Sequence, residues 1–154
     1  MFPRRITIPA GESVPSLLDQ SVGDFTLEVT ALPVAPSGSA LCDYGLIYRA
    51  QDLSRYYAFL VGADGYYTVI RMEDGTTTPL VPWQQFPHIQ RGPQPNRLLV
   101  TCADSVCDFR VNDEHAATVD DDAWLCGDVG TFARSGREQT VFRFVRVRLW
   151  QTGG

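Results

Sequence analysis

Short apolar-alternating segments, separated by turn residues, constrain what this chain can fold into more than any other feature. In residues 25–31 the apolar side chains alternate with Thr26, Glu28 and Thr30. Side chains of a strand point to opposite faces in turn, so this pattern predicts a half-buried strand. Similar segments recur along the chain, at residues 4–9, 44–50, 55–61, 66–72, 76–81, 97–103, 106–111, 115–119, 128–133 and 139–150.

Turn signals between these segments indicate antiparallel hairpins. Gly62-Ala-Asp-Gly65, Asp74-Gly75 and Asn112-Asp113 are typical of tight turns. Only Val14–Gln20 has the pattern of a helical turn, so no helix is long enough for a parallel crossover. The stretch from Pro82 to Pro95 is less regular.

The resulting prediction is an all-β, two-sheet antiparallel sandwich of the jelly-roll kind. The 154 residues suit one domain with one core. We expect a single domain over residues 1–154, with an N-terminal strand at 4–9 and the main sandwich at about 20–150.

The apolar pattern of the last segment changes parity. Phe142 and Phe144 share one parity, whereas Val147 and Leu149 share the other. A β-bulge after Phe144 would keep all of these side chains inward. The arginines of the segment would then form a solvated outer face, at positions Arg143, Arg146 and Arg148.

Four cysteines suggest disulfides and an oxidising compartment. Cys102 and Cys107 flank Ala-Asp-Ser-Val, a tight hairpin that would set them opposite each other. Cys42 and Cys126 would form the second pair. The alternative is that all four thiols are reduced and buried.

Metal sites have weak support in the sequence. Zinc would require C-x2–4-C spacing together with a second ligand pair; the only close cysteine spacing is C-x4-C, and His88 and His115 are not near each other. Calcium would have only the run Asp120–Asp122, whose three side chains cannot face one ion on a strand. We expect a solvated turn there, exposed histidines, and no cofactor.

Charge and hydropathy exclude several partners. The net charge is −5, which disfavours nucleic acid because phosphate binding needs a basic face. No apolar run is long enough for a membrane helix. Residues 1–10 lack the apolar region of a signal peptide, so the expected extracytoplasmic location would require an export signal outside this chain.

A set of strand and turn motifs resembles a known superfamily. The motifs, in chain order, are DYGLIYRAQD at 43–52, YYAFL at 56–60, DGYY at 64–67, Ile70-Arg71, Trp83, NRLLV at 96–100, FRVN at 109–112, GDVGTFA at 127–133 and FRFVRV at 142–147. This order resembles the concanavalin A-like lectin/glucanase superfamily, and within it the laminin-G-like and 3-keto-disaccharide-hydrolase-type domains. The resemblance implies a jelly roll over roughly residues 20–150, without specifying an activity.

Catalytic motifs are absent from the sequence. Glucanases of the superfamily carry E-x-D-x-E on one strand, and none of the five glutamates here has an acidic residue at that spacing on a predicted strand. No G-x-S-x-G nucleophile turn is present. The 3-keto-disaccharide hydrolase activity has no motif on which to rest, so we predict no catalytic residues.

Aromatic side chains give the positive indication of function. Sugars bind to aromatic faces with a few planar polar groups beside them. By parity we place a candidate ligand face opposite the core, formed by Arg49, Tyr56, Tyr67, Arg71 and Trp83.

The function predicted first is therefore a non-catalytic glycan-binding module of a secreted or cell-surface protein. An extracellular protein-interaction or sensory domain is the alternative, and a flat apolar patch would mark it. A glycosidase with an unrecognised site is the second alternative, and two carboxylates in one cleft would mark it.

Overall fold

A computed structural model describes residues 2–34 and 42–151 of the chain. Every regular element of this described part is a β-strand, and none of its segments is a helix that could cross a membrane. The strands are β1 (Arg4–Ile8), β2 (Ser13–Leu17), β3 (Phe25–Val34), β4 (Asp43–Asp52), β5 (Arg55–Gly62), β6 (Tyr66–Glu73), β7 (Thr76–Gln85), β8 (Asn96–Ala103), β9 (Val106–Val111), β10 (Glu114–Asp120), β11 (Asp128–Arg134) and β12 (Thr140–Gln151).

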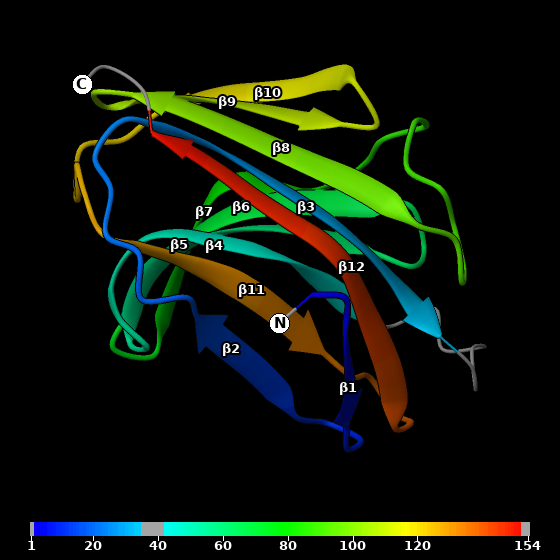
Figure 1. Cartoon of the computed structure of the whole chain (residues 1–154). Coiled ribbons are helices and arrows are strands. Elements are labelled where there is room, and N and C mark those ends of the chain that lie inside the picture. Colours follow the sequence, from blue (N-terminus) through cyan, green and yellow to red (C-terminus); the bar gives the residue numbers. More distant parts are fainter. Residues whose placement is uncertain (1, 35–41, 152–154) are drawn as a thin grey trace.

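The strands form two six-stranded antiparallel sheets that face each other (Figure 1). The first sheet has the order β1-β12-β3-β8-β9-β10, and the second has the order β2-β11-β4-β5-β6-β7. Distant segments pair in both sheets, with β12 beside β3 and β11 beside β4. The all-β jelly-roll sandwich predicted from the sequence is confirmed.

The core lies between the sheets and follows the alternation of the sequence. Phe25, Leu27 and Val29 of β3 are fully buried, and they face the inward side chains of β4, such as Leu46 and Tyr48. Burying one such side chain stabilises the fold by roughly 1.5–3 kcal/mol. The hydrophobic effect along these alternating segments therefore holds the two sheets together.

The predicted bulge in the last strand is confirmed. The register of β12 against β3 shifts between Phe144 and Arg146, so that Val145 is the extra residue. Phe142 and Phe144 stay buried on one side of the shift, and Val147 packs against the core on the other.

Two segments differ from the sequence expectation. The helical turn predicted at Val14–Gln20 is wrong, because residues 13–17 form the edge strand β2 against β11. An edge strand tolerates Pro15, and Gly130 lets β2 approach closely: a Cβ at Gly130 would lie 1.9 Å from the carbonyl oxygen of Ser16. The irregular stretch begins later than expected, since β7 continues to Gln85.

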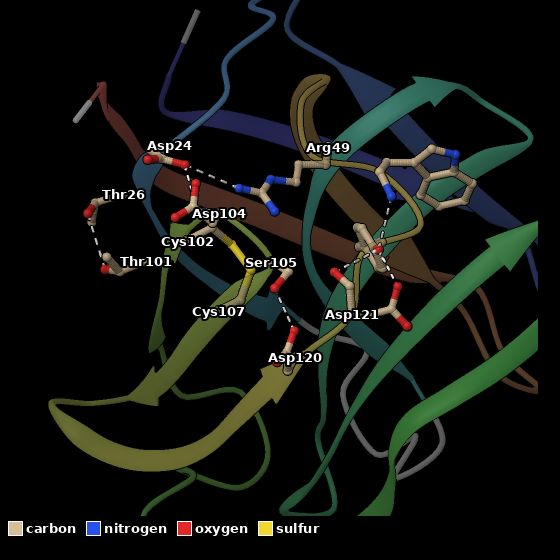
Figure 2. The surroundings of a disulfide bond; sticks show 12 residues. Asp24, Thr26, Arg49, Thr101, Cys102, Asp104, Ser105, Cys107, Asp120 and Asp121 are labelled. Carbon is tan, nitrogen blue, oxygen red and sulfur yellow. Dashed lines mark hydrogen bonds and ion pairs between the residues drawn. A yellow bond between two sulfur atoms is a disulfide. The ribbon is translucent and has the colours of Figure 1, made fainter. Parts of the chain in front are cut away.

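The hairpin disulfide is confirmed (Figure 2). Cys102 and Cys107 are direct partners in the β8–β9 register, and their sulfur atoms are bonded with the Cα atoms 4.1 Å apart. The two turn residues between the paired strands are Asp104 and Ser105.

The second predicted disulfide, between Cys42 and Cys126, is wrong. Cys42 precedes β4 at the end where Asp43 pairs with Arg134, whereas Cys126 precedes β11 near the pair of Asp128 with Ala50. Seven residues of strand, roughly 23 Å, separate these two ends. A disulfide needs Cα atoms within about 7 Å, so the antiparallel pairing keeps the two cysteines too far apart.

Candidate functional site

A pocket of about 300 Å³ opens on the outer face of the second sheet, the face turned away from the core. Asp43, Gly62 and Arg134 alternate with the core residues of their strands, so these three positions lie on the outer face of the sheet. We call this site the aromatic pocket; its lining residues are Cys42, Asp43, Gly62, Asp64, Tyr66, Trp83 and Arg134.

Trp83 reaches the pocket because of a bulge in β7. Between the pairs Tyr67–Gln84 and Val69–Val81, β6 contributes one residue and β7 contributes two, one of which is Trp83. A bulge of this kind redirects a side chain.

The two aromatic rings at the pocket are accessible to a ligand. Trp83 is 45% exposed and Tyr66 is 40% exposed, although both are large apolar side chains. Tyr66 begins β6, and its backbone amide donates to the Asp64 carboxylate over 3.2 Å. The pocket therefore presents two accessible aromatic side chains from neighbouring strands.

Arg134 and Asp43 supply the charged groups of the pocket. Arg134 Nε donates to Asp43 Oδ1 over 2.8 Å, and Arg134 Nη2 donates to Asp43 Oδ2 over 2.5 Å. Burial raises the pKa of the Asp43 carboxyl above its ordinary value, and the hydrogen bonds and charge of Arg134 partly oppose this rise. The geometry is that of a bidentate guanidinium–carboxylate pair.

The Arg134 guanidinium keeps donors available for a ligand. It has five N–H groups, of which two are directed at Asp43. Its side chain is 46% exposed and lies over the ring of Phe132, 5.7 Å from the ring centre. A fixed, planar hydrogen-bonding group thus stands beside the aromatic rings.

Cys42 also lines the pocket, but its chemistry is that of a thiol and not of a nucleophile. Burial, together with the negative charge of Asp43, raises the pKa of the Cys42 thiol to about 11. Cys42 therefore stays protonated at neutral pH. Because the thiolate is the reactive form, this thiol is a poor nucleophile.

The structure brings only Trp83, of the five predicted ligand residues, into this pocket. Arg49 was expected on an exposed face, but it is fully buried. Its φ of 47° lies in the left-handed region, at a register irregularity of β4, and this backbone conformation breaks the alternation. Its Nη2 donates to the Gly23 carbonyl over 3.2 Å and lies 3.7 Å from the Asp24 carboxylate (Figure 2).

Tyr67 and Arg71 point toward the other sheet instead of outward. Tyr67 is buried in the core, and its hydroxyl donates to the Ala116 carbonyl over 3.0 Å. Arg71 has the same parity and reaches Asp121 at one end of the sandwich, with 2.6 Å between Nη1 and Oδ2. The antiparallel register explains both placements, because it pairs these two residues with the inward side chains of β5.

Tyr56 does lie on the outer face of the second sheet, but it is buried there. It packs in a small apolar cluster with Ile47, Leu60 and Phe132. Burial raises the pKa of the Tyr56 hydroxyl, and the charge of Arg134 partly opposes that rise. Tyr56 therefore supports the floor beside the aromatic pocket without lining it.

Within the described residues, no three His, Cys, Asp or Glu side chains converge as metal ligands. Asp120 accepts a hydrogen bond from Ser105, whereas Asp121 accepts hydrogen bonds from Tyr57 and Arg71. These two neighbouring carboxylates therefore bind different partners. His115 lies on β10 beside Asp108 with Nε2 and Oδ1 2.8 Å apart, remote from His88 in sequence.

Sequence reasoning missed Asp43, Asp64, Tyr66 and Arg134. Asp43 and Arg134 are 91 residues apart, and only the β4–β11 register makes them neighbours. The available signals were DYG at the start of β4 and the end of GDVGTFAR in β11, which place a charged residue at each strand end.

Comparison with known proteins identifies the fold but no sequence family. No protein-family profile matches the chain, and no curated sequence matches it significantly. Among solved structures, the carbohydrate binding module CBM66 from Bacillus subtilis is similar, with a TM-score of 0.75 and 18% identity over 91% of this chain and 82% of that one.

Two further solved structures share the fold. Sheep galectin-11, in complex with glycerol, has a TM-score of 0.61 and 11% identity over 93% of this chain and 99% of its own. The GH43 protein BlXynB from Bacillus licheniformis has a TM-score of 0.64 and 18% identity over 94% of this chain and 32% of its own. The chain thus has the concanavalin A-like jelly-roll fold, shared with carbohydrate-binding modules and galectins.

Proposed function

We propose that this chain is a non-catalytic glycan-binding module and that the aromatic pocket holds the sugar. The observation that carries the proposal is the combination of two half-exposed aromatic rings, Trp83 and Tyr66, with the Arg134–Asp43 pair in one pocket. Sugars have apolar ring faces and a rim of hydroxyl groups, and this pocket offers a surface for each. The similar fold of carbohydrate-binding proteins supports the proposal.

In this proposal the apolar face of a sugar ring packs on Trp83. The N–H groups of Arg134 that are not directed at Asp43 donate to sugar hydroxyl oxygens. The Asp43 carboxylate fixes the guanidinium before binding, which reduces the conformational entropy lost when the ligand arrives. A pocket of this size suits one terminal sugar unit or a short segment of a glycan chain.

We propose an extracytoplasmic location for the domain. The Cys102–Cys107 disulfide supports it, because such bonds persist in oxidising compartments. Cell fractionation tests this: the chain should be recovered from an extracytoplasmic fraction, and recovery from the cytosolic fraction would overturn the proposed location.

A glycan array followed by calorimetric titration tests the binding proposal. Trp83→Ala should lower the affinity for the selected glycan at least about tenfold, since aromatic anchors dominate such contacts. Leu53→Ala is the control, because Leu53 is also a half-exposed large apolar side chain, at 55%, but lies outside both the aromatic pocket and the first sheet. Absence of binding to every glycan, or equal affinities of the two variants, would overturn the proposal.

A glycosidase is the second candidate, because two carboxylates, Asp43 and Asp64, line the same pocket. Glycoside hydrolysis uses such a pair as acid and base or nucleophile. However, both carboxyl oxygens of Asp43 accept hydrogen bonds from Arg134, so this group is engaged by the guanidinium instead of being directed at a substrate. Release of reducing sugar by the wild type, abolished in Asp64→Asn while binding persists, would replace binding with hydrolysis as the function.

A further inference from the structure

The outer face of the first sheet carries a concentration of arginines that the proposed sugar pocket does not use. Strand alternation directs these side chains away from the core, because their chain neighbours on the same strands pack inward. We call this surface the arginine face; it consists of Arg5 on β1, Arg97 on β8, and Arg143, Arg146 and Arg148 on β12, around Glu28 on β3.

Three of these arginines have no acidic partner. Among the described residues, no carboxylate lies within ion-pair distance of Arg5, Arg143 or Arg146. Arg5 and Arg143 are also direct partners in the β1–β12 register, so two like charges stand opposite each other. Such a pair destabilises a sheet, and a bound anion would relieve the repulsion.

Glu28 lies between the other two arginines, Arg97 and Arg148, and Arg97 also pairs with Asp113. It is 8% exposed, and its carboxylate oxygens lie 3.9 Å from Arg97 Nε on one side and 3.9 Å from Arg148 Nε on the other. Its Oε1 atom accepts no hydrogen bond within the described structure. The face therefore combines several guanidinium groups with one buried carboxylate oxygen that accepts no hydrogen bond.

The arrangement extends along β12. Outward side chains of a strand follow one another at about 7 Å, so Arg143, Arg146 and Arg148 form a row instead of a single cluster. Trp150, half exposed, stands on the same side at the end of this row. A row of cations that ends in an aromatic ring fits an extended anionic chain better than a small ion.

From these observations we propose that the arginine face is a second binding surface, which takes an acidic polysaccharide bearing carboxylate or sulfate groups. The anionic groups pair with Arg143, Arg146 and Arg5, while a sugar hydroxyl donates to Glu28 and a ring packs on Trp150. A sugar chain carries both the anions and the hydroxyl donors that this face requires. The backbone of double-stranded DNA offers charge to the arginines but carries no hydroxyl donor for Glu28. A lipid surface presents a plane of headgroups instead of the extended chain that the row fits.

Binding of dextran sulfate and of polygalacturonate, with neutral dextran as the uncharged control, tests the proposal. The wild type should bind both anionic polymers, with an affinity that falls as salt is added, and should not bind dextran. The variant Arg143→Gln/Arg146→Gln should bind at least about tenfold more weakly.

The control variant is Arg55→Gln/Arg91→Gln, which also removes two positive charges. Both are at exposed positions outside the arginine face and the aromatic pocket. It should bind the anionic polymers like the wild type, and so should Trp83→Ala, which separates this surface from the proposed sugar pocket. Thermal unfolding of each variant verifies its fold.

Equal losses in the two double variants would overturn the proposal, because they would show an effect of net charge alone. Equally tight binding of double-stranded DNA or of phosphatidylglycerol vesicles, lost in Arg143→Gln/Arg146→Gln, would overturn the assignment to a polysaccharide. A Glu28→Gln variant that binds DNA more tightly but polygalacturonate no better than the wild type would support the role given to Glu28.

Discussion

Arg134 and Asp43 are register partners on β11 and β4, and two hydrogen bonds of 2.8 Å and 2.5 Å join them. The Asp43 side chain is almost completely buried, whereas the Arg134 side chain is about half exposed. The pair therefore belongs both to the fold, through the carboxylate, and to the aromatic pocket, through the guanidinium.

Arg134→Gln should lower the free energy of unfolding by about 2 kcal/mol. Removing one member of a buried pair leaves the other charge without compensation, and the exposure of Arg134 reduces the cost below that of a fully buried pair. Urea unfolding at neutral pH measures the change. Arg55→Gln is the control, since the Arg55–Asp52 pair is exposed and its loss should be close to neutral. Equal changes in the two variants would contradict the structural role of Arg134.

Replacing Cys102 and Cys107 together by serine should lower the free energy of unfolding by about 2 kcal/mol. The bond closes a loop with a sequence separation of 5 residues, so the entropy it removes from the unfolded chain is small for a disulfide. Thermal and urea unfolding with and without reductant measure the effect. Cys126→Ser should have no effect in either condition, because Cys126 is exposed and outside the disulfide. A reductant-sensitive stability in the double serine variant would contradict the assignment of this bond.

Alternation in the sequence was sufficient to predict the sheets and the last bulge. Phe25, Leu27 and Val29 are buried as their spacing indicates, and the change of parity after Phe144 marks the bulge because every apolar side chain there must still face inward. The hairpin disulfide followed in the same way, from two cysteines that flank a tight turn. These features depend on neighbours in the sequence.

The candidate site depends on backbone conformation and on pairing between distant strands, which alternation does not encode. A positive φ at Arg49 turns into the interior a side chain that parity places outside. A bulge in β7 brings Trp83 to the pocket, and the pairing of β4 with β11 joins Asp43 to Arg134. Only Trp83 of the lining residues was therefore predicted as a ligand contact.

Alkaline pH should reduce the stability that Cys42 contributes. The pKa of its thiol is about 11 in the folded chain against an ordinary value of 9.0, because burial disfavours the thiolate. The contribution is fully present below pH 9, where both states are protonated, and is lost as the pH rises through 11. At pH 10 the loss should be about 1.4 kcal/mol.

The free energies of unfolding of the wild type and of Cys42→Ala, at pH 7.5 and pH 10, give this contribution by difference. Buried tyrosines with raised pKa values destabilise both proteins at pH 10, so only the difference between the two reports on Cys42. A difference that is independent of pH would show that the Cys42 thiol titrates alike in the folded and unfolded chain.

Asp121 should fix the segment after β10 onto one end of the sandwich. Its Oδ1 accepts from the Tyr57 hydroxyl over 2.5 Å and its Oδ2 accepts from Arg71 over 2.6 Å, while the Trp124 amide donates to the same hydroxyl over 3.3 Å. The ring of Trp124 also meets that of Tyr57 edge-on, with centres 5.2 Å apart. Asp121→Asn should therefore cost about 2 kcal/mol of unfolding free energy, and Tyr57→Phe about 1 kcal/mol.

Because the two side chains share one hydrogen bond, their effects should not add. The double variant should be less destabilised than the sum of the single variants by on the order of 1 kcal/mol, as measured by urea unfolding in a double-mutant cycle. Glycan affinity should be unchanged in all three proteins, since Asp121 lies apart from the residues that line the aromatic pocket. Additive effects would mean that Tyr57 and Asp121 stabilise the fold independently, and a loss of glycan affinity in Asp121→Asn would move the binding site to this end of the sandwich.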